Sequence, residues 1–307
     1  SYSMSSSLRK VFFILFAALF AAVAMLQAQD WMRGAVVVTS VAGEVIVEEA
    51  GGESLQMNPA DSLPLAVQGL LQIRTKEKDA VFLKTSNQIS IYHEGAGFFA
   101  IERFEQDVGT SIDQGKSRLI FNFRQGLLVV DNRVLSDDSQ MIVETPVGRI
   151  SVKDGWWLME IAYDQRSYRY DFSIECADGV LRFTALNGNT YTLRNRQRLR
   201  GAGESSHASI EVSEISDEAG ELFEEFALME ADAVALQLSA EIFLPKMKRL
   251  RQVESEVAET YQAPEGSAAK RPLIIEYAPQ SAAVTPFRAV IRACLLYTSP
   301  SPRDGLL

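Results

Sequence analysis

The chain has 307 residues with 40 acidic and 30 basic side chains, which gives a formal net charge of −10 at pH 7. An acidic balance argues against nucleic-acid binding, because a phosphate backbone is held by clustered lysines and arginines. Of the two cysteines, Cys294 lies in a terminal segment that we exclude below. Cys176 alone cannot form an internal disulfide, so a disulfide-stapled secreted scaffold is excluded.

The N-terminus has the pattern of a secretory signal. Arg9 and Lys10 precede the uncharged apolar run 11–26, and the small residue Ala28 follows at a plausible cleavage site. We therefore predict a signal peptide over residues 1–28, with an upstream scar before the first methionine, and a periplasmic or cell-envelope location. A retained membrane anchor stays open, because the run is at the short end of the roughly 17–25 residues that span a bilayer. Both alternatives export the rest of the chain.

The C-terminus looks foreign. Residues 294–304 read Cys-Leu-Leu-Tyr-Thr-Ser-Pro-Ser-Pro-Arg-Asp, which resembles the translation of a transposase adapter used in sequencing libraries. We treat residues 294–307 as an artefact and leave them out of the fold prediction. The native chain is expected to continue beyond about residue 293.

Residues 34–200 consist of short β-branched and aromatic runs separated by turn residues. The runs are 36–39, 43–47, 80–85, 88–92, 119–123, 127–130, 141–143, 172–176 and 180–183. Ala42-Gly43, Ser86-Asn87, Gln125-Gly126 and Asp178-Gly179 separate neighbouring runs, and Asp178-Gly179 is the strongest hairpin signal. This spacing predicts a mainly β fold: a β-sandwich, jelly-roll-like or β-roll domain of short antiparallel strands.

An acidic helical segment is predicted after this β domain, over residues 214–262, with a linker at 201–213. Ser216 before two acids is a typical helix start. Pro245 is expected to end or kink the first helix, a second helix is expected over 246–261, and 263–293 is interpreted as a linker and a truncated segment. Apolar residues recur at helical spacing in the first helix: Ile215, Ala219, Leu222, Phe223, Phe226, Met229 and Ala233.

This apolar stripe either packs on the β domain, mediates self-association or binds a partner helix. Binding to a membrane surface is not expected, because interfacial helices are usually basic and this segment is acidic.

A series of short motifs in residues 34–200 resembles the exported domain of the FecR family of bacterial envelope proteins. The motifs are Gly43-Glu44-Val45-Ile46-Val47, Leu71-Gln72-Ile73-Arg74-Thr75, the strand pairs within 80–92 and 119–130, Glu144-Thr145-Pro146-Val147-Gly148 and Asp178-Gly179-Val180. Three positions depart from the family pattern, at Leu71-Gln72, Ser86-Asn87-Gln88 and Lys153-Asp154-Gly155. The chain is therefore similar to a divergent member.

The resemblance implies envelope signalling, but part of the family pattern is absent. The best-known members carry a cytoplasmic anti-sigma domain ahead of a membrane helix, and here only a few residues precede the apolar run. We therefore do not expect sigma-factor regulation.

Catalytic motifs are nearly absent from the sequence. No nucleophile elbow, His-Glu-x-x-His pair or Gly-rich phosphate loop occurs. His93 is interpreted as a turn residue, His207 as solvated and Cys176 as a buried structural thiol, while Trp156 and Trp157 are expected to point to opposite faces of a strand. We therefore predict no enzyme activity, no cofactor and no metal site.

The candidate binding residues are Arg194, Arg196, Arg198 and Arg200. On a strand, their period of two would place all four guanidinium groups on one face, where they suit the carboxylates or phosphates of an anionic glycan or lipid headgroup. Two other interpretations stay open, a charged edge strand that resists aggregation and pairing with the acidic helices downstream.

Together these features predict a non-catalytic, exported binding or scaffolding module of a bacterial cell envelope. Its partner would be an envelope protein, an anionic glycan or a lipid. The first alternative is an envelope sensor that contacts a receptor without its own anti-sigma domain. The second is the N-terminal part of a carbohydrate-active enzyme whose catalytic domain is lost by truncation.

Overall fold

A computed structural model describes residues 31–49, 52, 54–108, 115–235 and 240–250. The predicted signal peptide, the C-terminal linker and the adapter-like segment lie outside the described residues. The strands are β1 (Trp31–Arg33), β2 (Ala35–Ala42), β3 (Val45–Glu49), β4 (Ser54–Met57), β5 (Leu65–Gln68), β6 (Leu71–Thr75), β7 (Ala80–Thr85), β8 (Ser90–Asp107), β9 (Ser117–Asp131), β10 (Gln140–Thr145), β11 (Gly148–Asp164), β12 (Arg169–Ala185), β13 (Thr190–Leu193), β14 (Gln197–Gly203), β15 (Ser209–Glu214) and β16 (Lys248–Arg249). The helices are α2 (Asp217–Ala235), α3 (Ala240–Phe243) and the 3₁₀ turn η1 (Leu244–Lys246).

Four long strands organise the fold. β8, β9, β11 and β12 have 18, 15, 17 and 17 residues, and the two halves of each strand have different neighbours. The first half of β8 pairs with β7 and its second half with β6, while the first half of β12 pairs with β14 and its second half with β13. The long strands therefore pass from one layer of the sheet to the other.

Bends inside these strands replace two of the predicted hairpins. Gly126 and Gly179 have φ angles of 103° and 94°, and each lies within one continuous strand, β9 or β12. The predicted hairpin at Asp178-Gly179 and the predicted turn at Gln125-Gly126 were therefore wrong. Glycine at positive φ permits a sharp bend of one strand as readily as a reversal, and the local sequence is the same in both cases.

The other two predicted turns also differ in role. Ser86-Asn87 does connect a hairpin, because β7 and β8 pair from Lys84 opposite Ser90. Ala42-Gly43 joins two strands that do not pair with each other: β2 pairs with β5 and β7, whereas β3 pairs with β4 and β6. Here the chain crosses between the layers.

One hydrophobic core draws side chains from both layers. Val36 and Leu83 come from the layer that contains β2 and β7, and Val45 and Phe121 from the layer that contains β3 and the first half of β9. Alternation is clear in strands such as β10, whose inward residues are buried while their neighbours are not. The predicted mainly β fold with a later helix is confirmed. The strands are longer than predicted, and one pairing, β9 with β10, is parallel.

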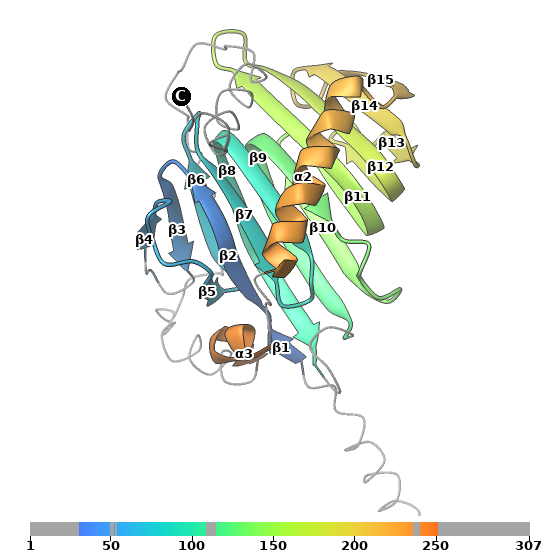
Figure 1. The fold of residues 1–307 in the computed structure, drawn as a ribbon. Helices are drawn as coiled ribbons and strands as arrows, with labels where there is room; N and C mark the ends of the chain where they lie inside the picture. The colour runs from blue at the N-terminus through green and yellow to red at the C-terminus, as the bar shows by residue number, and fades with distance from the viewer. Residues whose placement is uncertain (1–30, 50–51, 53, 109–114, 236–239, 251–307) are drawn as a thin grey trace, which may run out of the picture.

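Helix α2 lies across the outer face of the sheet (Figure 1). Ser216 caps it, since its Oγ accepts a hydrogen bond of 3.2 Å from the backbone nitrogen of Ala219. Phe223 and Phe226 are buried against Phe82, Leu127, Val129 and Leu158, and all seven residues of the predicted stripe belong to this cluster. The stripe therefore packs on the protein's own β domain.

Two local predictions around α2 were wrong. The expected linker 201–213 is largely strand, because β14 extends to Gly203 and β15 begins at Ser209. The expected second helix does not begin at Lys246, which lies in η1, and the following β16 pairs with β1. Residues 251–261 of that predicted helix are outside the described residues. Within the part of the chain that is described, no helix is long and apolar enough to cross a membrane.

Candidate functional site

The four candidate arginines do not lie on one strand face. β13 ends at Leu193 and β14 begins at Gln197, so Arg194 and Arg196 are in the connecting turn and only Arg198 and Arg200 are in a strand. The expectation of one continuous strand was therefore wrong. The physical reason is Arg196, whose φ of 63° reverses the chain where a strand would have continued it.

The two strand arginines lie beside carboxylates of β12, the Arg198 pair largely buried and the Arg200 pair exposed. The Arg198 Nε lies 3.4 Å from Oε1 of Glu175, whose side chain is 3% exposed, and Arg200 lies 3.6 Å from Asp171. Glu175 also accepts a 2.9 Å hydrogen bond from the backbone nitrogen of Ser216. Arg198 therefore helps to hold the start of α2, and both carboxylate partners come from β12 rather than from the acidic helix.

Arg194 and Arg196, in the turn between β13 and β14, are exposed, and hydrogen bonds hold their backbone in place. The Arg196 backbone nitrogen donates to the Cys176 carbonyl at 2.8 Å, and that of Arg194 donates to the Gln197 side chain at 2.8 Å. Asn195, between them, accepts a 2.8 Å hydrogen bond from the backbone of Gly179. Within the described residues neither turn guanidinium forms an ion pair. These hydrogen bonds hold the backbone of the turn, which places the exposed side chains of Arg194 and Arg196 beside the bend of β12.

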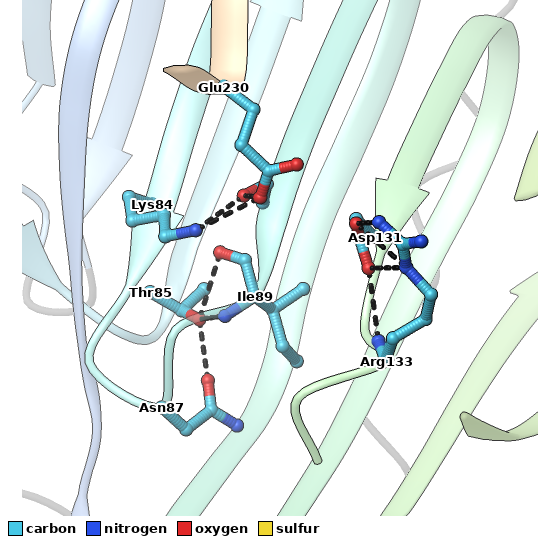
Figure 2. A network of polar contacts seen from close by, with 8 residues as sticks. Lys84, Thr85, Asn87, Ile89, Asp131, Arg133 and Glu230 are labelled. Atoms are coloured by element: carbon cyan, nitrogen blue, oxygen red, sulfur yellow. Dashed lines mark hydrogen bonds and ion pairs between the residues drawn. The ribbon is translucent and has the colours of Figure 1, made fainter. Parts of the chain in front are cut away.

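A buried polar network joins α2 to the sheet (Figure 2). The ammonium group of Lys84 donates to Ser90 Oγ at 2.6 Å and lies 3.2 Å from Glu230 of α2, and Ser90 also donates to Glu230. The Lys84 side chain is only 7% exposed. Loss of one partner of such a pair is strongly destabilising, because a buried charge is left uncompensated. The network therefore fixes the C-terminal half of α2.

A second ion pair lies next to this network. Figure 2 shows Arg133 directed at the carboxylate of Asp131, and its Nε lies 3.0 and 3.1 Å from the two carboxylate oxygens. The hydrogen bond to Asp131 raises the pKa of Arg133. The guanidinium carbon of Arg133 lies 4.8 Å from the ring centroid of Trp156, beside α2. These contacts link the residues after β9 to Trp156, which packs against α2.

His93 is a core residue, and the prediction of a turn role was wrong. It lies inside β8, fully buried, where its Nδ1 donates to the Leu127 carbonyl at 3.0 Å and its Nε2 lies 2.9 Å from the Thr75 hydroxyl. Burial lowers the pKa of His93 from 6.5 to about 4. The strand continues past His93 because the bend occurs at Gly95 and beyond, which the turn-like sequence does not distinguish from a chain reversal.

This burial predicts a pH-dependent loss of stability. In the unfolded chain His93 takes up a proton near pH 6.5, whereas in the folded chain it does so only near pH 4. The destabilising contribution of His93 is therefore absent well above pH 6.5 and grows as the pH falls from 6.5 to 4. The difference corresponds to about 3 kcal/mol. His93→Gln should flatten the profile between these values, as measured by denaturant unfolding at each pH. Equal slopes in the two proteins would contradict the assignment.

The other candidate residues, Cys176, His207 and the two tryptophans, are either buried in the packed interior or exposed to solvent. Cys176 is buried as predicted, and burial, with the nearby Asp178 and Asp154 charges, raises the pKa of its thiol to about 12. His207 is exposed, as predicted. Trp157 lies in the core and Trp156 under α2, which confirms their opposite faces. Among the described residues no group of three His, Cys, Asp or Glu side chains is placed to hold a metal ion.

Sequence reasoning missed the residues that fasten α2. Lys84 was visible as the one charge in the run 80–85, and a lone charge in a buried strand is a signal that a partner exists. Glu175 gave the same signal in the run 172–176. The identity of the partners, Glu230 and Ser216, depends on the path of α2 over the sheet and could not be read from either run.

No protein-family model matches the chain. No curated protein matches it significantly. Two solved structures, each named provisionally as an anti-sigma factor from Parabacteroides distasonis ATCC 8503, show weak similarity. The first is 11% identical with a TM-score of 0.37 and covers 48% of this chain and 61% of that one. The second is 10% identical with a TM-score of 0.36 and covers 47% and 60%.

The matches thus extend over about three fifths of those solved chains. A TM-score below 0.5 does not establish a shared fold, so these matches assign no function to the chain.

Proposed function

We propose that this chain is an exported, non-catalytic binding module of a bacterial cell envelope, and that it binds an anionic glycan at the turn that carries Arg194 and Arg196. The observation that carries the proposal is the contrast within the arginine series. Arg198 and Arg200 are paired with carboxylates of β12, whereas the turn pair is exposed and forms no ion pair within the described residues.

The chemistry of the turn supports this assignment. Guanidinium groups bind carboxylates through two parallel hydrogen bonds, and such charge-assisted contacts are stronger than neutral ones. The backbone hydrogen bonds of Arg194 and Arg196 hold the turn, so less ordering is required on binding. The apolar N-terminal run and the resemblance of residues 34–200 to the exported FecR domain support the envelope location.

Calorimetric titration with a galacturonic acid hexamer tests the proposal, with chitohexaose as the neutral counterpart. The Arg194→Gln/Arg196→Gln variant should bind the acidic hexamer at least about tenfold more weakly, since each lost charge-assisted contact is worth roughly 1.5–3 kcal/mol. The matched control is Arg166→Gln/Arg169→Gln, which removes two exposed arginines from the turn between β11 and β12 and should keep wild-type affinity. Equal loss in both variants, or no loss in either, would contradict the proposed site. Cell fractionation of the full chain tests its export.

A further inference from the structure

Two side chains stand out on the surface. Among the exposed large apolar side chains of the described residues, Tyr168 is 72% exposed and Leu228 is 70% exposed, more than any of the others. Tyr168 lies in the turn between β11 and β12, and Leu228 lies on the outer side of α2. Neither belongs to the arginine turn, so they are unexplained by the proposed function.

The turn around Tyr168 contains two arginines and one acid, Asp164. Arg166 and Arg169 are exposed on either side of Tyr168 and form no ion pair within the described residues. The carboxylate of Asp164 accepts hydrogen bonds from the Arg166 backbone nitrogen at 3.0 Å and from the Ser167 hydroxyl at 2.6 Å. These contacts present Tyr168 to solvent between two cations.

Tyr168 also has an unfavourable backbone conformation. Its φ is 55°, in the left-handed region that bulky residues rarely occupy. Glycine would relieve this strain, so the tyrosine side chain lowers the stability of the turn. Strain of this kind is a reason to look for a role of the side chain.

The turn extends beyond its neighbouring strand. The pairing of β11 with β9 ends at Ile161 opposite Gly126, whereas the pairing of β11 with β12 continues to Asp164 opposite Arg169. The rings of Tyr163 and Tyr170 pack at the base of the extension with a centroid separation of 4.6 Å. The extension is therefore accessible to another molecule, and the packing of Tyr163 on Tyr170 restricts its movement at the base.

The charges around Leu228 are negative, opposite in sign to the arginines around Tyr168. Glu224 and Asp232 lie one helical turn before and after Leu228, are exposed, and form no ion pair within the described residues. Helix α2 contains no basic residue. Each surface thus has an apolar centre between two like charges, and the charges of one surface are opposite to those of the other.

We infer that the chain self-associates, with the β11–β12 turn of one copy docked on the outer face of α2 of a second copy. Tyr168 would pack on Leu228, and Arg166 and Arg169 would pair with Glu224 and Asp232. Tyrosine and arginine are among the residues most enriched at binding hot spots. Every copy carries both halves of this contact, which is why a second copy fits better than an unrelated partner.

Sedimentation velocity over a wide concentration range, at low and at high salt, tests the inference on the full chain. The wild-type protein should associate, and high salt should weaken the association. Arg166→Glu/Arg169→Glu and, separately, Glu224→Arg/Asp232→Arg should each raise the dissociation constant at least about tenfold. An equimolar mixture of these two variants should recover association, because the reversed charges are again complementary.

Leu186→Ser removes a different exposed apolar side chain, 55% exposed, and should leave association unchanged. Tyr168→Gly should weaken association while the protein stays folded, since it relieves the strained backbone. A wild-type protein that is monomeric throughout, an association that neither reversal weakens, or a mixture that fails to recover would each overturn the inference. None of these results bears on the arginine turn, which glycan titration tests separately.

Discussion

Replacing Gly179 with alanine is expected to lower the free energy of unfolding by about 3 kcal/mol or more. Gly179 has a φ of 94° at the bend of β12, and a Cβ there would lie 2.3 Å from the carbonyl oxygen of Asp154 and 2.6 Å from the Cα of Gly155. Both contacts are with backbone, so no side chain can move to relieve them. Denaturant unfolding of the variant measures the loss.

Gly188→Ala is the matched control for this substitution. Gly188 has a similar φ of 88°, but no atom lies within 4 Å of an added Cβ. It should therefore lose only the left-handed backbone term, about 1–2 kcal/mol. If both variants lose the same free energy of unfolding, an added Cβ at Gly179 meets no backbone atoms. That result would contradict the close packing at the bend of β12.

Replacing Phe226 with alanine is expected to cost about 3–5 kcal/mol. Its ring is fully buried between α2 and the sheet, with its centroid 5.4 Å from that of Phe82 and 6.5 Å from that of Trp156. The loss should appear in denaturant unfolding and as faster amide exchange along α2, because this side chain lies at the centre of the helix–sheet contact.

Leu228→Ala provides the comparison on the same helix. Leu228 is 70% exposed, so at protein concentrations too low for association its removal should change stability by less than about 0.5 kcal/mol. Similar losses for both variants would mean that α2 does not pack on the sheet through the Phe226 face.

Local sequence signals predicted the positions of some strands and of the main helix. β7 was predicted with its observed bounds because Val81, Phe82, Leu83 and Thr85 favour a strand and the turn residues Ser86-Asn87 follow. The start of α2 was predicted because Ser216 precedes acidic residues on an apolar stripe. These signals are local. The class of fold followed from their number and spacing.

The bends and the layer assignment could not be predicted because they are not local. Gly126 and Gly179 have the sequence of hairpin turns, and only the pairing of β9 and β12 with strands on both sides of each bend shows that the chain continues forward. His93 was misplaced for the same reason, since the bend that follows it resembles a turn in sequence.

The candidate arginines stay a prediction as a binding site, but their arrangement can be compared with the sequence. The period of two assumed a strand that Arg196 interrupts at positive φ. The distinction between paired and available arginines depended on Glu175 and Asp171, which are separated from them in sequence and adjacent only through the register of β12 and β14.

The proposed binding turn is tested most directly by mapping amide chemical shifts of the isotope-labelled protein while the galacturonic acid hexamer is added. We predict saturable changes confined to Arg194, Asn195 and Arg196 and to the adjoining bend at Asp178 and Gly179. The β11–β12 turn, which also carries exposed arginines, should be unaffected. Changes centred elsewhere, or no saturable change, would contradict the account.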